Sequence, residues 1–440
     1  MASAEPSSVD RALEAWAAEK YAAGLRAALP VLEAQPADAL ALFTCAYLGA
    51  KLGEPAAFAD GLRAAGERAI DLGNLPLAIA ACGFARELGI DASALYDTAA
   101  AAYARGSSRL KRQAPPALPT AGPSLKALPD SLKDAELTTR AQKAVRASAE
   151  HLLTLPGGGG GPLPAAPLFS SLDEPALRAF LEIFTPKLYA SGKRVVEEGS
   201  TGTEAFVVAR GELDVTRHAM NSSIVHLARL GAGALVGEMA LLSRAPRAAT
   251  VMATGPALLL IARKAELDQA VTKSPLLGRE FAEHCRRRML DNLIKTSPIL
   301  RSVNPGERPD LVQRFAIRAF EPGERLITQG RVTDGLFLIA SGEVGIVHKE
   351  PNGESTVVAR LGPGEVLGEV ALVLRRTANA SVIAQHPTIT LLLPRERFLD
   401  AVRAHPQVFV DLYELASRRD EETSSVAGLE TVDLDASILV

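Results

Sequence analysis

The second half of the chain repeats itself at a constant offset of 131 residues. Gly237-Glu238 recurs as Gly368-Glu369. The same offset relates further glycines, prolines and aromatic residues: Pro167 and Pro298, Gly192 and Gly323, Gly199 and Gly330, Phe206 and Phe337, Gly211 and Gly342, Gly231 and Gly362, Gly233 and Gly364. Chance does not keep one register over more than 100 residues. The chain must therefore contain two copies of one domain of about 130 residues.

Short apolar or β-branched runs bounded by glycine fill the middle of each copy. Even spacing of such runs is typical of a small antiparallel barrel or jelly roll. In the first copy we expect strands at 194–196, 205–208, 213–215, 224–227, 250–252 and 257–261, and helices at 172–184, 264–271 and 276–294. In the second copy we expect helices at 309–317, 395–402 and 407–420. The predicted fold class is α+β multidomain: an N-terminal all-α, helical-repeat-like domain, then two tandem β-roll or jelly-roll barrels, each flanked by helices.

The segment 236–251 carries the clearest chemical pattern of the repeat. Gly237 lets the backbone approach a ligand closely, and a short helix then opens with free N–H groups at its positive end. Glu238 follows the glycine, and Arg247 comes nine residues later, before a β-branched run. An acid and an arginine around a helix N-terminus suit a small ligand that carries hydroxyls and a single phosphate. The alternative is a simple ion pair between these two side chains in a barrel without ligand.

The repeat resembles the cyclic-nucleotide-binding domain family over residues 165–420. The resemblance rests on Gly211-Glu212 and on the segments 237–242 and 246–250. Two such domains in tandem, without a DNA-binding domain, resemble the regulatory subunits of cyclic-AMP-dependent protein kinase. They are less similar to the bacterial catabolite activator, which carries one barrel and a helix-turn-helix. The resemblance implies that a ligand shifts the population between open and closed arrangements of barrel and helix.

The resemblance also implies a role for each residue of the first site. Arg247 binds the two free phosphate oxygens, which requires the planar fork of a guanidinium. Glu238 accepts the ribose 2′-hydroxyl, and Gly237 permits close approach. Ala248 stands where a hydroxyl residue would favour guanine, so cyclic AMP is the expected ligand and cyclic GMP the second candidate. The expected ligand-binding set is Gly237, Glu238, Met239, Ala240, Arg247, Ala248 and Ala249, with backbone N–H groups near Ala240 and Ala249 completing the phosphate cradle.

The second copy departs from this pattern. Its altered site comprises Gly368, Glu369, Ala371, Ala378 and Asn379. Ala378 stands where the first copy has Arg247, and Asn379 follows it. A buried phosphate without its arginine loses a charge-assisted pair, which costs about 2–5 kcal/mol. We expect this barrel to bind no cyclic nucleotide, or another ligand, and to serve as an interaction surface; the alternative is that Arg375 or Arg376 reaches the site from another side.

Residues 1–105 are expected to form an all-α domain. Alanine and leucine recur there at three- and four-residue spacing. The stretch 39–58 weakly resembles a tetratricopeptide repeat. The resemblance implies a groove that holds a partner peptide, and the alternative is a plain helical bundle used for dimerisation or as a cap. Glycine or proline punctuates the pattern at Pro30, Pro36, Gly53, Gly73 and Gly89.

Residues 106–164 are expected to be a linker rich in proline and glycine, with one amphipathic helix at about 131–154. The glycine run 157–161 predicts a flexible tether, so the helical domain is expected to move relative to the rest. Lys111-Arg112 with Ala114 faintly resembles the inhibitor segment of a kinase regulatory subunit, but Pro115 stands where a large apolar residue belongs. The barrel domains are placed at 165–297 and 298–420, and an acidic flexible tail at 421–440.

Composition restricts the function further. The net charge of -3 gives no electrostatic reason to expect nucleic acid as a partner. No apolar run approaches the roughly 20 residues of a membrane span, and the first residues lack the apolar segment of a signal peptide, so we expect a cytoplasmic protein. The 3 cysteines and 7 histidines follow no metal-ligand spacing, and we find no nucleophile–base motif. We therefore expect no metal, no cofactor and no catalytic residue.

These observations predict a non-enzymatic sensor. Cyclic AMP would bind the first barrel, and the signal would reach a protein partner held by the helical domain or by the second barrel. The alternative is a constitutive protein-interaction scaffold whose barrels bind no ligand.

Overall fold

The contacts of the chain divide it into two units. The computed structural model describes residues 6–111, 122–155, 161–218, 224–238, 241, 246–297, 303–304, 306–307, 311, 314–350, 352 and 354–436, with the backbone alone at 288, 290–292, 294–296 and 422–436. The first unit comprises Met1–Leu241 and Ala249–His284, and the second comprises Leu242–Ala248 and Cys285–Val440. Each unit has a hydrophobic core of its own.

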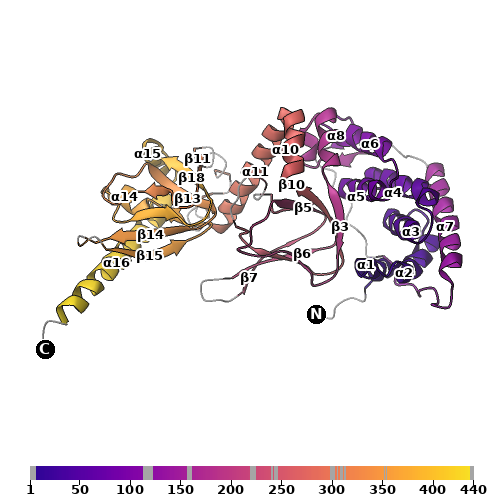
Figure 1. Ribbon diagram of the computed structural model, residues 1–440. Coiled ribbons are helices and arrows are strands. Elements are labelled where there is room, and N and C mark those ends of the chain that lie inside the picture. The colour runs from indigo at the N-terminus through magenta and orange to yellow at the C-terminus, as the bar shows by residue number, and fades with distance from the viewer. Residues whose placement is uncertain are drawn as a thin grey trace. The chain divides into compact units, whose positions relative to one another are not determined.

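The N-terminal part of the first unit is helical, as the apolar spacing predicts. From α1 to α5 each helix packs against the next along the chain (Figure 1). An aromatic cluster fills the centre: the Trp16 ring stacks on Tyr47 with centroids 4.2 Å apart, and Phe84 lies 5.0 Å from Trp16. The tetratricopeptide-like character stays a prediction. The helices are α1 (Ser8–Ala17), α2 (Tyr21–Ala34), α3 (Ala39–Leu52), η1 (Pro55–Phe58), α4 (Ala59–Asp71), α5 (Leu75–Glu87), α6 (Ser93–Tyr103) and α7 (Asp134–Thr154).

The sequence predicts that Pro30 separates two helices. This prediction is wrong, because Pro30 lies inside α2. Proline has no N–H, so the carbonyl of Arg26, four residues earlier, loses its intrahelical partner. The N–H of Leu128 donates to that carbonyl at 3.0 Å. The Arg26 guanidinium in turn donates to the Leu132 carbonyl at 2.8 Å and to the Asp134 carboxylate at 2.9 Å. The interrupted helix thus supplies an attachment point for the segment that leads to α7.

The segment 122–133 is therefore attached to the helical domain, although its composition predicts a linker. Its Leu125 exchanges hydrogen bonds with the Ser8 hydroxyl at 2.8 and 2.9 Å. The helix expected at about 131–154 begins at Asp134 and packs on α2, α3 and α4. Gly61 on α4 makes the approach of α7 possible, because a Cβ there would lie 2.2 Å from Cγ1 of Val145. Residues 112–115 of the faint inhibitor-like segment lie outside the described residues.

The first copy of the repeat forms a β-sandwich. Its two antiparallel four-stranded sheets have the orders β3-β10-β5-β8 and β4-β9-β6-β7. Strands β3 and β8 were not expected from the sequence. The strands are β3 (Thr185–Tyr189), β4 (Arg194–Val196), β5 (Glu204–Arg210), β6 (Leu213–His218), β7 (Ile224–Leu230), β8 (Leu235–Val236), β9 (Thr250–Ala253) and β10 (Ala257–Arg263).

The second copy forms the same sandwich, and each of its strands lies 131 residues after its counterpart. The sheet orders are β11-β18-β13-β16 and β12-β17-β14-β15. The expected closed barrels are therefore wrong: among the described strands the pairing leaves two separate sheets with open edges in each copy. The strands are β11 (Ala316–Phe320), β12 (Arg325–Ile327), β13 (Gly335–Ser341), β14 (Val344–Lys349), β15 (Ser355–Leu361), β16 (Val366–Leu367), β17 (Ser381–Ala384) and β18 (Thr388–Pro394).

Helices flank both sandwiches. The helix expected at 309–317 is cut short, because β11 begins at Ala316. The last helix passes the expected start of the tail at 421, and its backbone stays helical to Ala436. The remaining elements are β1 (Leu110–Lys111), β2 (Leu163–Pro164), η2 (Phe169–Ser171), α8 (Glu174–Glu182), α10 (Lys264–Lys273), α11 (Pro275–Thr296), α14 (Glu369–Val373), α15 (Arg395–Ala404) and α16 (Pro406–Ala436).

The helical domain packs directly against the first sandwich. Helix α5 lies against β3, β5 and β10, and α6 lies against α8 (Figure 1). A Cβ on Gly83 would come within 2.3 Å of Pro186, so the glycine lets α5 seat on β3. Arg86 donates to the carbonyls of Glu182 at 2.9 Å and Phe184 at 3.2 Å. The mobility expected from the glycine run is therefore wrong, because both parts share one compact unit.

An ion pair at the same interface has a pH-dependent contribution to stability. The Asp10 carboxylate on α1 lies 2.7 Å from the Arg210 guanidinium at the end of β5. Burial alone would raise the pKa of Asp10, but Arg210 and the hydrogen bonds from Ser7 outweigh burial and hold the pKa below its usual value. A depressed pKa stabilises the folded state fully above the unfolded pKa, about 3.9, and the contribution is lost as pH falls through the folded pKa.

We expect Asp10→Asn to lower the free energy of unfolding by about 1.5–3 kcal/mol at pH 7. The difference from wild type should begin to shrink near the unfolded pKa of about 3.9, where the unfolded carboxyl takes up its proton, and should be lost as pH falls through the lowered folded pKa. Urea denaturation across this range measures both. Asp60→Asn is the matched control, since that carboxylate is 82% exposed and pairs only across one helix turn. An equal loss at pH 7 and pH 3 would contradict the assignment.

Candidate functional site

The first site begins where β8 ends. Pairing of Val236 with Phe206 fixes the end of the strand, and Gly237 then turns the backbone at φ +74°. Only glycine adopts this region at no steric cost. Glu238 follows with 6% of its surface exposed. The Leu241 N–H donates to the Glu238 carbonyl at 3.0 Å, and Lys264 Nζ donates to the Leu241 carbonyl at 3.2 Å. Glu238 therefore lies in a buried turn whose backbone is hydrogen-bonded, and its role in binding a ligand stays a prediction.

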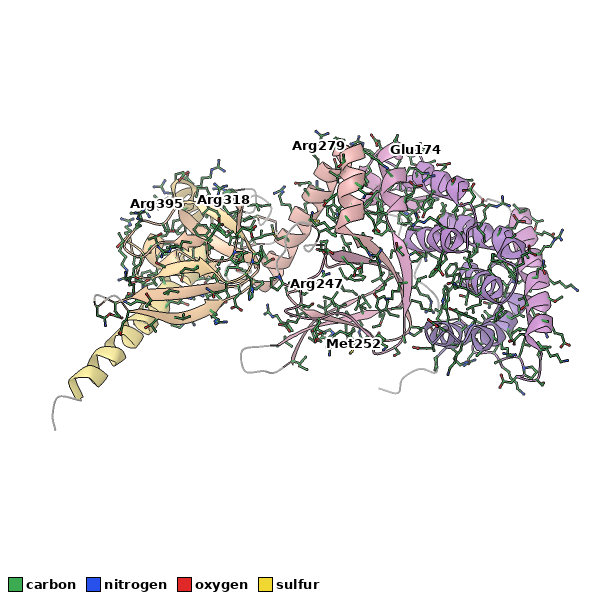
Figure 2. All side chains as sticks on the ribbon, in the orientation of Figure 1. Glu174, Arg247, Met252, Arg279, Arg318 and Arg395 are labelled. Atoms are coloured by element: carbon green, nitrogen blue, oxygen red, sulfur yellow. The ribbon has the colours of Figure 1, made fainter. Side chains whose placement is uncertain are left out.

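The remaining predicted residues of the first site are divided between the two units. Arg247, labelled in Figure 2, and Ala248 belong to the second unit, whereas Ala249 belongs to the first. Arg247 is half-buried and Ala248 is exposed. Met239 and Ala240 lie outside the described residues. Because Glu238 belongs to the first unit and Arg247 to the second, the approach of the two side chains stays a prediction.

The second site lies wholly within the second unit. Gly368 has φ +83°, and a Cβ there would lie 2.6 Å from the Gly335 carbonyl. This close approach and the left-handed backbone together require glycine. Helix α14 starts at Glu369, which is 2% exposed, and Ala371 is buried on the same helix. The glycine, the acid and the buried alanine of the repeat therefore occupy the turn that the sequence predicts.

The position of the missing arginine is occupied by core packing. Ala378 is 8% exposed and belongs to the hydrophobic cluster of the second sandwich, with Ile327 and Val382. Its backbone is also paired: Ala378 N–H donates to the Arg331 carbonyl at 2.9 Å, and Gly330 N–H donates to the Ala378 carbonyl at 2.8 Å. A methyl group in an apolar cluster offers a phosphate no donor and no charge.

Two polar residues of the second site were not predicted from the sequence. Arg419, on α16, donates to Glu369 at 2.8 Å. Asp420, the next residue, pairs with the Arg376 guanidinium and accepts from Nδ2 of Asn379 at 3.3 Å. Arg376 was the alternative to the missing arginine, but its guanidinium pairs with the Asp420 carboxylate. The sequence signal that could have pointed to Asp420 is its counterpart at the constant offset, the apolar Met289.

Metal-binding clusters and membrane-spanning helices can be sought only in the part of the chain that the structure describes. Within it, no cluster of three or more His, Cys, Asp or Glu side chains could hold a metal ion. A helix long and apolar enough to cross a bilayer is likewise not found among the described residues. Cys45, Cys82 and Cys285 are buried and form no disulfide, and burial raises the pKa of Cys82 to about 12 and also raises the pKa of Cys45.

Comparison with known proteins agrees with the two-fold repeat. The family model for the cyclic nucleotide-binding domain matches residues 186–274 and 317–405. The chain carries two tandem cyclic nucleotide-binding domains. The first sandwich with its helices is domain A and the second is domain B. The two matched ranges lie 131 residues apart, which is the offset of the repeat.

Relatives of the two domains include a kinase regulatory subunit. The chain is 35% identical over 233 residues to the cAMP-dependent protein kinase regulatory subunit of Yarrowia lipolytica, covering 52% of this chain and 57% of that protein. The chain thus spans little more than half the length of this curated relative. The regulatory domain of Toxoplasma gondii PKA with cAMP is 26% identical, with a TM-score of 0.29, over 57% of this chain and 92% of that one. The Thermus thermophilus catabolite activator protein is 32% identical, with a TM-score of 0.28, over 31% of this chain and 63% of that one.

Proposed function

We propose that the chain is a non-enzymatic sensor that binds cyclic AMP in domain A and passes the signal to a protein partner. The observation that carries the proposal is the retained pattern of domain A: a buried acid after a left-handed glycine, with Arg247 in the same segment. In this assignment Glu238 accepts the ribose 2′-hydroxyl, and the Arg247 guanidinium binds the phosphate through two parallel N–H···O bonds. The adjoining Ala248 offers guanine no hydroxyl, which favours cyclic AMP over cyclic GMP.

The contacts of α8 supply a route from domain A to the helical domain. Arg178 on α8 lies 2.6 Å from the Asp97 carboxylate on α6, and its guanidinium lies 5.0 Å from the Tyr96 ring centroid. The Arg105 N–H donates to the Leu172 carbonyl, just before α8, at 2.7 Å. A displacement of α8 therefore has to move α6 with it or break these contacts. Ligand binding in domain A can reach a partner of the helical domain through this pair of helices.

A protein kinase is the first partner to test. The Yarrowia lipolytica relative is a regulatory subunit of such a kinase, and a regulatory role in the cytoplasm suits a chain with two cyclic nucleotide-binding domains. The helical domain and domain B are the two candidate contact regions. Co-purification of the full chain from cell extract, with and without cyclic AMP, tests both the partner and its dependence on the ligand.

Isothermal titration calorimetry of the full chain tests the binding step. We expect one molecule of cyclic AMP to bind per chain at micromolar concentration or below, with cyclic GMP binding more weakly. One site is expected because domain B has Ala378 in place of the phosphate-binding arginine. If neither nucleotide gives heat at micromolar concentration, the alternative of a constitutive scaffold takes the place of the sensor.

A further inference from the structure

The second site is covered by the last helix of its own domain. Nη1 of Arg419 donates to the Glu369 carboxylate at 2.8 Å and to the Val366 carbonyl at 2.5 Å. Its Nη2 lies 3.7 Å from the Glu365 carboxylate. The side chain of Arg419 is 17% exposed and that of Glu369 is 3% exposed. The acid that domain A would offer to a ribose is therefore already paired with a cation of the same chain in domain B.

Asp420 covers the other end of the site. Its carboxylate pairs with the Arg376 guanidinium and accepts from Nδ2 of Asn379 at 3.3 Å. Residues 376 and 379 flank Ala378, the position at which domain A has its arginine. Two consecutive residues of α16 thus place a cation on the acid and an anion in the segment where a bound phosphate would lie.

The anion-holding half of this arrangement is particular to domain B. In domain A the three residues at the positions of Arg376, Asn379 and Asp420 are all uncharged and lack side-chain hydrogen-bonding groups of comparable strength: Ala245, Ala248 and Met289. The other half has charged counterparts in Glu238 and Arg288. Domain B therefore lacks the phosphate-binding arginine and carries instead the Asp420 carboxylate, an anion of its own chain, in the segment where the phosphate would lie.

We propose that Arg419 and Asp420 of α16 are the permanent internal occupant of the second site, and that they hold domain B closed without any nucleotide. Glu369 is buried, so leaving it unpaired would carry a large desolvation penalty. Arg419 removes this penalty, and Asp420 fixes the segment 376–379 from the same helix. Because the proposal concerns domain B in the absence of ligand, it does not depend on whether domain A binds cyclic AMP.

Hydrogen exchange on the full chain without nucleotide tests the proposal. In wild type, the amides of residues 366–380 should be protected, because opening this segment requires α16 to leave. Arg419→Met and Asp420→Ala should each increase the exchange rate of this segment at least tenfold. Arg397→Met is the matched control, since it removes the same guanidinium from an exposed position on α15, and it should leave the rate unchanged. Unchanged exchange in both α16 variants would overturn the proposal.

A charge swap separates occupation of the site from general helix packing. Asp420→Arg alone places two guanidinium groups together and should open the segment. Adding Arg376→Asp restores an opposite pair and should return most of the protection. A role in packing alone predicts no such rescue, so failure of the double variant to recover would contradict the proposal.

The same measurement with cyclic AMP examines the closed state directly. In an Arg247→Ala background, saturating cyclic AMP should leave the exchange of residues 366–380 unchanged. Strong protection by the nucleotide would show an accessible second site and overturn the internal occupant. The nucleotide-free comparison would still report on α16 if domain A proved unable to bind cyclic AMP, so the two failures can be distinguished.

Discussion

Replacing Arg247 by alanine is expected to lower the affinity of the chain for cyclic AMP by about 30-fold to several-thousand-fold. The range corresponds to the roughly 2–5 kcal/mol lost when one partner of a buried, hydrogen-bonded charge pair is removed. Arg247→Lys should recover only part of the loss, because an ammonium cannot bind two phosphate oxygens in one plane. Calorimetric titration of wild type and both variants measures the effect.

Arg229→Ala is the control for the change in charge. Its guanidinium is 60% exposed on β7 and pairs with Asp214, so it should leave the affinity within about twofold of wild type, the size expected for an exposed pair. An Arg247→Ala variant that binds as tightly as wild type would remove Arg247 from the proposed site.

The repeat offset let the sequence predict most of the second half of the fold. Strands with β-branched runs, such as those at 250–252 and 257–261, were expected where β9 and β10 lie. The missed strands have weaker signals. Strand β3 contains Pro186 and Lys187 and shows no alternation of polar and apolar residues, and β8 has only two residues. Pairing with neighbouring strands, which sequence patterns do not reveal, defines both.

The errors about the first half share one cause. A proline inside a helix and a run of glycines both have local meanings, and each was overridden by distant residues. Pro30 is accommodated because Leu128, about a hundred residues later, takes the freed Arg26 carbonyl. The glycine run does not separate the helical domain from domain A, because Gly83 and Arg86 fasten α5 to the strand and helix that follow it. The composition of a connecting segment does not reveal whether the domains on either side of it pack against each other.

The sequence predicted the glycine and the acid of each candidate site, but not the residues of α16 that contact the second site. A glycine followed by an acid carries its own physical signature, and in each domain the glycine has a positive φ and the acid is buried. The role of α16 could not be predicted in the same way, since Arg419 lies 50 residues from the acid with which it pairs. Only the fold brings such residues together. The difference between Met289 and Asp420 is visible in the sequence, but it acquires a meaning only once Arg376 is seen beside it.

Phe180→Ala is expected to have the largest effect on stability, lowering the free energy of unfolding of the first unit by about 3–5 kcal/mol. The ring on α8 is 1% exposed. Its centroid lies 5.4 Å from that of Phe169, 5.2 Å from that of Phe184 and 6.3 Å from that of Phe281 on α11. Removing the ring leaves a cavity between α8 and α11. Phe409→Ala, at a ring that is 38% exposed on α16, should cost less than about 1 kcal/mol.

Thermal unfolding of these variants with cyclic AMP links packing to ligand binding. A ligand at 100 times its dissociation constant stabilises the folded state by about 2.7 kcal/mol. Cyclic AMP should therefore recover a large part of the Phe180→Ala loss, because the assigned contacts of Glu238 and Arg247 are intact in that variant. Arg247→Ala should gain little from the same concentration, since it is no longer far above its dissociation constant. If cyclic AMP stabilised Arg247→Ala as strongly as wild type, the nucleotide would have to be bound elsewhere in the chain.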